Sequence, residues 1–236
     1  MKREILALTL TFSLMVFLAV FLTGFVSAAV KNVDGSCTNT IPGDDPLCDD
    51  GITYLTIQAA IDAASSGDTI NVASGTYNEN IVIDKSLNLI GSPGNSPGPG
   101  PNAPVLDGLG TVGSAITING GVSNVKIQGF EITDYRNSGL SGGVGSGVLA
   151  WNSVGISNIE ILDNYFHDLG WSAVLFGNEG QSLHDNILVE NNLIEDIAFY
   201  SIELTNTKNS IVRDNTVTGG IGVVYTTVLT ENTDDG

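Results

Sequence analysis

Ile161-Leu162-Asp163-Asn164-Tyr165-Phe166 is one of four six-residue stretches in this chain that superpose without gaps. The other three begin at residues 127, 189 and 212, so successive copies start 34, 28 and 23 residues apart. Spacings of about 20 to 50 residues are typical of solenoids, propellers and other repeat arrays. In each copy, apolar side chains two residues apart flank a polar or turn-forming pair, the pattern of a strand that bends and resumes. The sequence therefore predicts a repeat protein whose units are strand, turn and strand.

A second set of short strands precedes the four repeated stretches. These companion strands are predicted at residues 116–118, 148–150, 174–176 and 202–204. Two recurring sets of strands indicate stacked coils rather than hairpins, because each coil pairs only with its neighbours and tolerates insertions on one rim. The predicted fold class is all-β, a parallel β-helix over residues 54–236.

One short helix is predicted at the N-terminal end of this region. Residues 56–64 place Ile57, Ala60 and Ile61 on one face, and Gly67 follows to end the helix. We expect this helix to cap the open end of the first coil. Residues 91–104, with five prolines and four glycines, are predicted to form a protruding loop between coils, and residues 137–147 a second loop.

The first 28 residues have the pattern of an export signal. Lys2 and Arg3 are followed by an uncharged apolar run over residues 5–25, and small residues at 26–28 predict cleavage before Ala29. An uncleaved anchor is the alternative, and it would be the only contact with a membrane. Either outcome places the rest of the chain outside the cytoplasm, secreted or at the cell surface.

The two cysteines lie in the segment that follows. Residues 29–53 are rich in glycine, proline and aspartate and are predicted to be irregular. In an exported protein, two cysteines this close together predict a local disulfide, Cys37–Cys48.

The charge composition limits which classes of molecule this chain could bind. The chain holds 26 acidic and 8 basic residues, a formal net charge of −18, and no basic cluster lies beyond the first three residues. Nothing would neutralise a phosphate backbone, which argues against nucleic acid. Such a surface suits an extracellular protein, divalent cations or neutral glycans.

Residues 54–91 carry a family resemblance. Tyr54 to Ala64, the pairs Gly67-Asp68 and Ile90-Gly91, and Gly75-Thr76-Tyr77 resemble the N-terminal cap and first coil of pectin-lyase-like right-handed β-helix proteins. With the coils behind them, the resemblance covers about residues 54–229. It implies a right-handed solenoid, but its relatives include surface-layer and adhesin-like proteins, carbohydrate-binding and sugar-hydrolase domains, lyases and methylesterases, and fold alone does not select among them.

An asparagine column runs through three of the four aligned stretches. It consists of Asn164, Asn192 and Asn215, whereas Phe130 occupies this position in the first copy. The resemblance implies an internal asparagine stack. An amide at a strand bend can bond backbone groups of its own coil and the next, so the predicted role is structural.

An aspartate column lies just beyond the repeated stretches. Asp134, Asp168 and Asp196 align, and Gly219 ends the column. Coils about 4.8 Å apart would bring these carboxylates near one another. Three interpretations are open: turn-forming aspartates, a calcium site, or carboxylates that raise one another's pKa toward general-acid use. Calcium is therefore a candidate ligand, and no other cofactor is predicted.

Two enzyme classes are open alternatives. A glycoside hydrolase needs an acid and a carboxylate facing one sugar, and Asp168 and Asp196 with His167 are the candidate catalytic residues. The resemblance to pectate lyases implies an arginine or lysine base, for which Arg136 is best placed. Pectin methylesterase is disfavoured, because Ala173 stands where that family has a catalytic aspartate.

Candidate glycan contacts are Asp134 and the aromatic side chains of Trp151, Tyr165 and Trp171, which could stack on sugar rings or pack at the rim. The sequence thus predicts a secreted or cell-surface β-helix that binds polysaccharide or builds an adhesin-like envelope module, with a lyase or hydrolase as the alternative. The coil begun at residues 223–229 has no recognisable cap, so further coils or a partner are expected to cover its edge.

Overall fold

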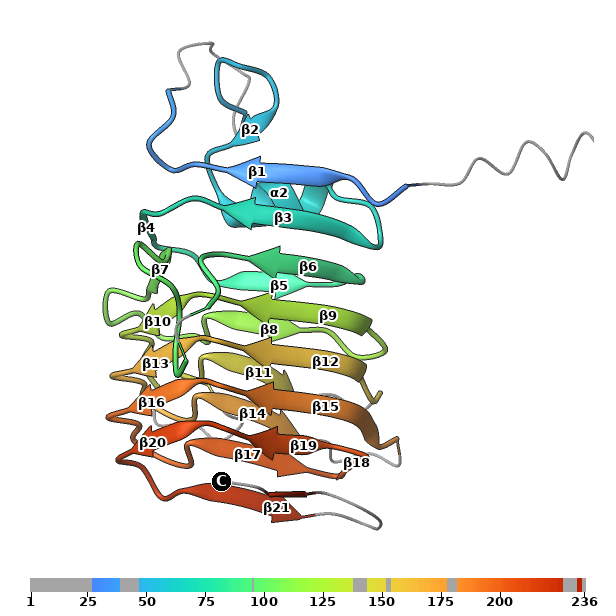
Figure 1. The fold of residues 1–236 in the computed structure, drawn as a ribbon, viewed down its shortest axis with the longest axis vertical. Helices are drawn as coiled ribbons and strands as arrows, with labels where there is room; N and C mark the ends of the chain where they lie inside the picture. Colours follow the sequence, from blue (N-terminus) through green and yellow to red (C-terminus); the bar gives the residue numbers. More distant parts are fainter. Residues whose placement is uncertain are drawn as a thin grey trace, which may run out of the picture.

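The solenoid is visible in a computed structural model that describes residues 27–38, 47–94, 96–137, 144–151, 154–177, 182–226 and 233–234 (Figure 1). Most of the predicted export signal, residues 1–26, lies outside the described residues. The described strands pair in parallel in three sheets, which we call A, B and C and which stack their strands along one axis. The predicted parallel β-helix is confirmed.

Sheet A is the longest of the three, in the order β2-β1-β3-β6-β9-β12-β15-β19-β22, with β18 paired beside β15. Its strands are β1 (Val30–Val33), β2 (Thr53–Tyr54), β3 (Asp68–Val72), β6 (Leu87–Ile90), β9 (Ser123–Gln128), β12 (Ser157–Leu162), β15 (His184–Glu190), β18 (Thr207–Lys208), β19 (Ile211–Arg213) and β22 (Thr233–Asp234).

Sheets B and C contain six strands each. Sheet B comprises β4 (Thr76–Tyr77), β7 (Val105–Asp107), β10 (Glu131–Thr133), β13 (Tyr165–His167), β16 (Leu193–Glu195) and β20 (Thr216–Thr218). Sheet C comprises β5 (Ile81–Ile83), β8 (Ile116–Ile118), β11 (Val148–Trp151), β14 (Val174–Gly177), β17 (Ile202–Thr205) and β21 (Val223–Thr226).

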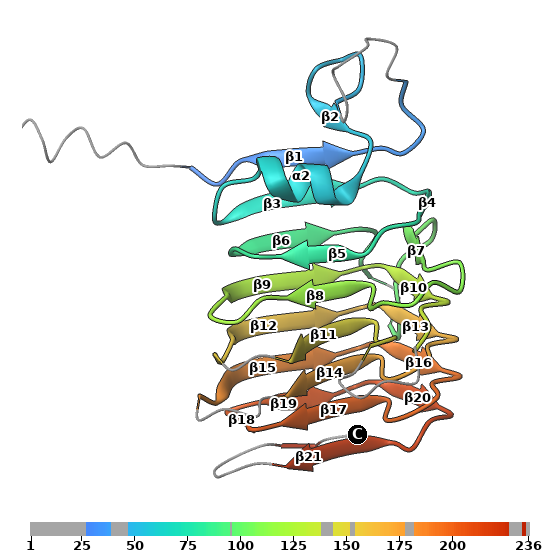
Figure 2. The ribbon, with the colours of Figure 1, turned by 180° about the vertical axis from the view of Figure 1, so that it is seen from behind.

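Each coil takes one strand from each sheet, in the order A, B, C. The first coil is β3-β4-β5 and the sixth is β19-β20-β21. Sheet A faces the viewer in Figure 1 and sheet C faces the viewer in Figure 2. In each view the strands of the nearer sheet point to the left while the chain advances downward. The chain therefore turns right-handed as it advances, the hand that parallel crossovers strongly prefer.

The pairing register agrees with the self-alignment of the sequence. Ile161 lies opposite Ile127 on one side and Val189 on the other, and Val189 lies opposite Val212. The companion strands are also in register, with Val174 between Val148 and Ile202. Residues with the same position in the repeat therefore occupy the same position in successive coils.

The core fills the space between the three sheets. Ile127, Ile161 and Val189 from sheet A, and Ile132 and Phe166 from sheet B, are all fully buried. Their neighbours in sequence point outward, as in the alternating burial of β12 and β13. Because side chains in a strand alternate between faces, the apolar positions of every repeat meet in one continuous column.

Helix α2 (Ile57–Ala63) lies over the first strand of sheet C (Figure 2). The Gln58 side chain acts on the edge of β5 as a neighbouring strand would: its Nε2 donates to the Val82 carbonyl at 3.3 Å, and its Oε1 accepts from the Val82 N–H at 2.8 Å. At the helix start, the Glu79 carboxylate accepts from the N–H groups of Ile57 and Gln58. At its end, Lys85 Nζ donates to the Ile61 carbonyl at 3.0 Å.

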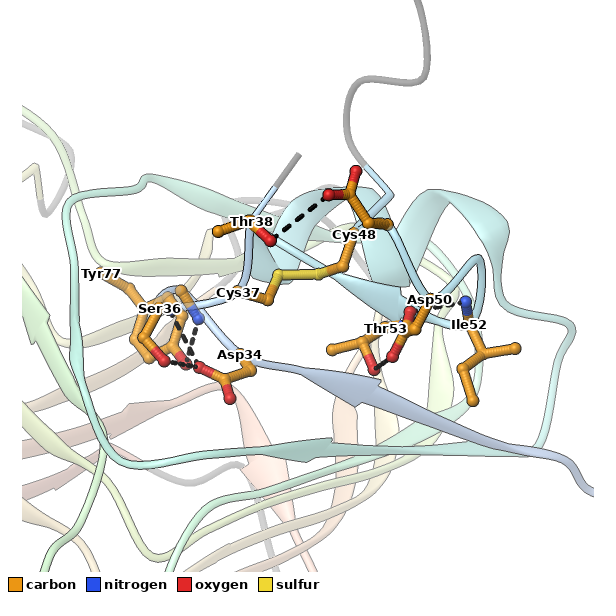
Figure 3. Close-up of a disulfide and its surroundings, with 11 residues drawn as sticks. Asp34, Ser36, Cys37, Thr38, Cys48, Asp50, Ile52, Thr53 and Tyr77 are labelled. Carbon is orange, nitrogen blue, oxygen red and sulfur yellow. Dashed lines mark hydrogen bonds between the residues drawn. A yellow bond between two sulfur atoms is a disulfide. The ribbon is translucent and has the colours of Figure 1, made fainter. Parts of the chain in front are cut away.

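The segment before the helix differs from the prediction. Residues 30–33 are not irregular but form β1, which pairs along its whole length with β3 and is followed across the sheet by β2. The predicted disulfide is present, with 5.8 Å between the Cα atoms of Cys37 and Cys48 (Figure 3). The carboxylates of Asp34 and Asp50 stabilise the flanking turns, because they accept hydrogen bonds from the Ser36 N–H and the Thr53 hydroxyl.

The glycine- and proline-rich segment 91–104 does not protrude as predicted. Its N–H groups at Ser92 and Gly98 donate to the carbonyls of Gly129 and Asn191, at 2.8 and 2.9 Å, and Gly98 is buried. Gly129 leaves room for this approach, because a Cβ there would lie 2.5 Å from the Ser92 backbone. Turn-rich sequence thus forms a loop that lies against the coils and reaches the fifth one.

Candidate functional site

The corner between sheets A and B contains the asparagine column. Asn164 and Asn192 are fully buried, and the Asn192 Oδ1 accepts from both the N–H and the Nδ2 of Asn164, at 2.9 and 3.1 Å. Asn215 Oδ1 accepts from Asn192 in the same way. Each Nδ2 also reaches a carbonyl of the preceding coil, as Asn192 does at Ile161. The amides therefore satisfy backbone groups that burial would otherwise leave without partners.

The aspartate column lies at the corner between sheets B and C. Asp134, Asp168 and Asp196 have φ values of 57°, 52° and 49°, and Gly219 has 94°. This is the left-handed conformation, which aspartate, asparagine and glycine adopt most readily. Among the described residues, no group of three or more aspartate, glutamate, histidine or cysteine side chains is arranged to hold a metal ion. The left-handed backbone of the turn is by itself sufficient to select these residue types.

The described side-chain partner of Arg136 is Asp134. Its Nη2 pairs with the Asp134 carboxylate, and its side chain is 53% exposed. Among the described contacts of His167, none is with Arg136. The structure thus pairs Arg136 with Asp134, and the described contacts include none between Arg136 and Asp168 or Asp196.

A polar cluster around His167 covers the outer face of sheet B. The His167 Nε2 lies 3.2 Å from Glu131 Oε1, and its Nδ1 lies 2.8 Å from Asp168 Oδ2. Its ring stacks on that of Tyr165, with 4.3 Å between ring centroids. The Tyr165 hydroxyl donates to Glu195 Oε2 at 2.7 Å. Four of these residues belong to β10, β13 and β16, whose outward side chains the parallel register places side by side.

The acidic neighbours of Tyr165 affect its ionisation. Burial, the hydrogen bond to Glu195 and the nearby charges of Glu195, Glu131 and Asp168 raise the pKa of Tyr165 to about 12. The phenol therefore stays protonated at neutral pH and acts as a hydrogen-bond donor, not as a base.

The candidate aromatic residues do not form one strip. Trp171 packs against Phe199, with ring centroids 4.5 Å apart, and Phe199 packs edge-on against Tyr200. Trp151 lies instead at the end of β11, where it packs over Gly177, and a Cβ at Gly177 would lie 2.1 Å from its ring. Tyr165 is occupied by its stack with His167. Trp171 and Tyr165 thus pack against other rings, whereas Trp151 remains 38% exposed.

A groove of about 440 Å³ opens at the corner between sheets A and B. We call it the loop-walled groove, because segment 91–104 contributes one side of it. It is lined by Ser96, Leu162, Asp163, Glu190, Asn191 and Asp214. Asp163, Asn191 and Asp214 occupy the same turn in three successive coils, with φ values of 52°, 61° and 55°. Left-handed turns thus point a row of polar side chains toward one side of the solenoid.

Hydrogen bonds and an ion pair hold four of the side chains that line this groove, those of Ser96, Asp163, Glu190 and Asn191. Asp163 accepts from Gln128 Nε2 at 2.6 Å and from Asn191 Nδ2. Glu190 Oε2 lies 3.0 Å from Arg213 Nη2. The Ser96 hydroxyl donates to Asn191 Oδ1, and this bond joins segment 91–104 to the turn between β15 and β16. The groove therefore presents preorganised carboxylate and amide groups.

Sequence reasoning did not identify this groove. Its turn positions are the third column of the self-alignment, which contains Gly129, Asp163, Asn191 and Asp214. The column was visible, but nothing in the local sequence indicates that a loop from the second coil ends beside it. The predicted aspartate column lies elsewhere. Four grooves, including this one, are formed by described residues, and none of the four is lined by Asp134, Asp168 or Asp196.

His184 has a structural role. It is fully buried, its Nδ1 accepts from the Ile156 N–H at 3.1 Å, and its Nε2 donates to the Gly177 carbonyl at 2.9 Å. Burial lowers the pKa of His184 from its ordinary value of 6.5, against the opposing effect of the Gly177 hydrogen bond. The neutral ring joins two turns on the side of the solenoid away from the loop-walled groove.

Comparisons of this chain with protein-family models, curated proteins and solved structures find no match. Within the described part of the chain, no helix combines the length and apolarity needed to cross a membrane. Function must therefore be inferred from the residues and geometry of the sites themselves.

Proposed function

We propose that this chain is an exported, pectin-lyase-like β-helix protein that binds a neutral polysaccharide, at the cell surface or within an envelope layer. The observation that carries the proposal is the loop-walled groove, with its row of carboxylate and amide groups held in place by hydrogen bonds. The Cys37–Cys48 disulfide supports a location outside the cytoplasm. The cap sequence at residues 54–91 supports the pectin-lyase-like assignment.

The charges of the groove favour a neutral ligand. Sugar hydroxyls donate well to carboxylates, and charge-assisted hydrogen bonds of this kind are about twice as strong as neutral ones. An acidic glycan would instead meet Asp163, Glu190 and Asp214, of which Glu190 is paired with Arg213. The net charge of −18 adds to this repulsion at low ionic strength.

Retention on a panel of immobilised polysaccharides tests the proposal. The panel contains neutral mannan, xylan, β-glucan and galactan, and acidic polygalacturonate and alginate, each with and without calcium. We expect retention on a neutral member, independent of calcium and without new products. Retention on the acidic members alone would contradict the proposal.

Asp214→Asn tests the groove itself. The substitution keeps the size of the side chain and suits a left-handed backbone, but it removes the negative charge. We expect affinity for the retained polysaccharide to fall about fivefold, the difference between a charge-assisted and a neutral hydrogen bond. Asp84→Asn, a matched change at an exposed carboxylate outside the groove, should leave affinity unaltered.

A glycoside hydrolase or lyase is the second candidate, favoured by the cluster of His167, Glu131 and Asp168 on sheet B. Such an enzyme would release reducing ends, or unsaturated products that absorb in the ultraviolet, from a member of the panel. His167→Gln should abolish that release while retention in the loop-walled groove persists. If no member is turned over, the binding function stands alone.

A further inference from the structure

We propose that the loop-walled groove is one end of a longer binding surface, and that a linear neutral glycan runs obliquely across sheet A, from this groove at the corner with sheet B toward β6. This inference rests on the proposed function and extends its site. The outer face of sheet A is turned toward the viewer in Figure 1.

Two further grooves lie on the same face. The middle groove, about 140 Å³, is lined by side chains of β12, β15 and β19, including Glu160, Leu188 and Arg213. The upper groove, about 270 Å³, is lined by side chains of β6, β9 and β12, including Asn88, Lys126 and Glu160. The two grooves are centred on strands two coils apart, a separation of about 10 Å, because stacked strands are about 4.8 Å apart.

Shared residues and ion pairs connect the three grooves. Glu160 lines both the upper and the middle groove, and its Oε2 lies 2.9 Å from Lys126 Nζ. Arg213 of the middle groove pairs at 3.0 Å with Glu190 of the loop-walled groove. A continuous path of polar groups therefore runs from β6 to β19.

An asparagine ladder borders this path. Asn158 Nδ2 donates to Asn124 Oδ1 at 3.0 Å, and Asn186 Nδ2 donates to Asn158 Oδ1 at 2.8 Å. All three residues are exposed and have left-handed φ values between 54° and 56°. Unlike the buried column at Asn192, this ladder exposes amides in three successive coils, those of β9, β12 and β15. Regularly spaced donors and acceptors suit a polymer with a regular repeat.

The floor of the path adds apolar contacts. Leu188 and Ile211 are half-buried outward residues that face each other in the β15 and β19 register, and both line the middle groove. Apolar side chains beside hydrogen-bonding groups match the apolar face and hydroxyl rim of a sugar ring. An extended peptide fits less well, because β9, β12 and β15 already pair on both sides and offer no free strand edge.

Affinity as a function of chain length tests the inference. Isothermal titration would use disaccharides through octasaccharides of mannan, xylan, β-glucan and galactan. We expect the affinity for the best series to rise at least tenfold from tetrasaccharide to octasaccharide, because contacts along a connected surface reinforce one another.

Two variants localise the effect. Glu160→Gln and Leu188→Glu should each weaken octasaccharide binding at least fivefold and leave tetrasaccharide binding, in the loop-walled groove, within twofold. Glu203→Gln, on sheet C, is the matched control and should change neither. Circular dichroism would establish that each variant retains the fold.

The outcomes separate the two proposals. If octasaccharides bind no better than tetrasaccharides while Asp214→Asn still weakens both, the extended surface is wrong and the groove stands. If no oligosaccharide of any series binds, the proposed function fails and this inference fails with it. Octasaccharide binding that Leu188→Glu leaves intact would also overturn the extended surface.

Discussion

At the scale of single residues, the backbone conformation at the corners of the coil determines which residue types occur there. Of the thirteen described non-glycine residues with positive φ, all but Leu109 are asparagine or aspartate. These residue types tolerate the left-handed region because short polar side chains bond locally. Polar columns such as Asp134, Asp168 and Asp196 can therefore arise from turn geometry alone, so an aligned column of aspartates does not by itself identify a ligand site.

Removing the amide of Asn192 should destabilise the solenoid strongly. Asn192→Ala removes the Oδ1 that accepts from the Asn164 N–H and the Nδ2 that donates to the Ile161 carbonyl. Asn192 is fully buried, so water cannot replace these bonds. We expect the free energy of unfolding to fall by about 3 kcal/mol, since more than one buried group loses its partner. Urea titration measures the change, and Asn78→Ala, an exposed amide with one bond to Asp107, should cost about 0.5 kcal/mol.

His184 should make stability depend on pH. Because its pKa in the folded protein is lowered below 6.5, the unfolded chain takes up the proton first as the pH falls. Stability is therefore complete above about pH 7.5 and declines as the pH drops through about 6.5. Protonated Nδ1 could no longer accept from Ile156.

Thermal melts of wild type and His184→Gln between about pH 7.5 and about pH 5.5 measure this contribution. The wild type should lose stability relative to the variant on acidification. Burial raises the pKa of Glu203, which opposes the trend in both proteins and cancels in the comparison. Parallel curves for the two proteins would rule out the role given to His184.

At the scale of elements, helix α2 replaces a strand. Gln58 supplies both a donor and an acceptor to Val82, so the backbone of β5 is paired on a side where sheet C has no further strand among the described residues. Unpaired strand edges invite association with other chains. The helix thus protects an edge as well as covering the core.

Gln58→Ala should expose that edge. The loss of both hydrogen bonds to the Val82 backbone is expected to lower the free energy of unfolding by about 1 to 2 kcal/mol and to increase self-association. Sedimentation velocity would detect the association, and thermal melting the loss of stability. Asp62→Ala, on the same helix, removes only the contact with the Gln58 side chain and serves as the control.

The sequence predicts the strands and their register more completely than it predicts the candidate sites. The register of Ile127, Ile161 and Val189 follows from the apolar spacing of the repeats, because a shift of one residue would turn the core side chains outward. Strand β1 was missed because Val30–Val33 pairs with β3, from which the disulfide-containing segment and α2 separate it in sequence. The loop-walled groove depends on Ser96 meeting Asn191, 95 residues later, which local patterns do not encode.

At the scale of the whole molecule, the three sheets present different chemistry. Sheet B presents the cluster around His167, sheet A presents three connected grooves, and sheet C is covered at its first strand by α2. Because parallel strands pair in register, residues at the same outward position of successive coils line up along the axis. A few side-chain types per coil therefore determine the chemistry of each face. One scaffold can thus hold the proposed binding face and a separate polar cluster on different sheets.

The segment 91–104 also changes how the coils depend on one another. In a solenoid each coil is coupled mainly to its immediate neighbours, so one end can unravel while the other remains intact. The bonds from Gly98 and Ser96 to Asn191 connect the second coil directly to the fifth. These bonds couple the second to fifth coils into one cooperative block. The part of the proposed binding surface that lies on β6 to β15 is therefore held as a unit, whereas the sixth coil, with β19, depends on its immediate neighbour.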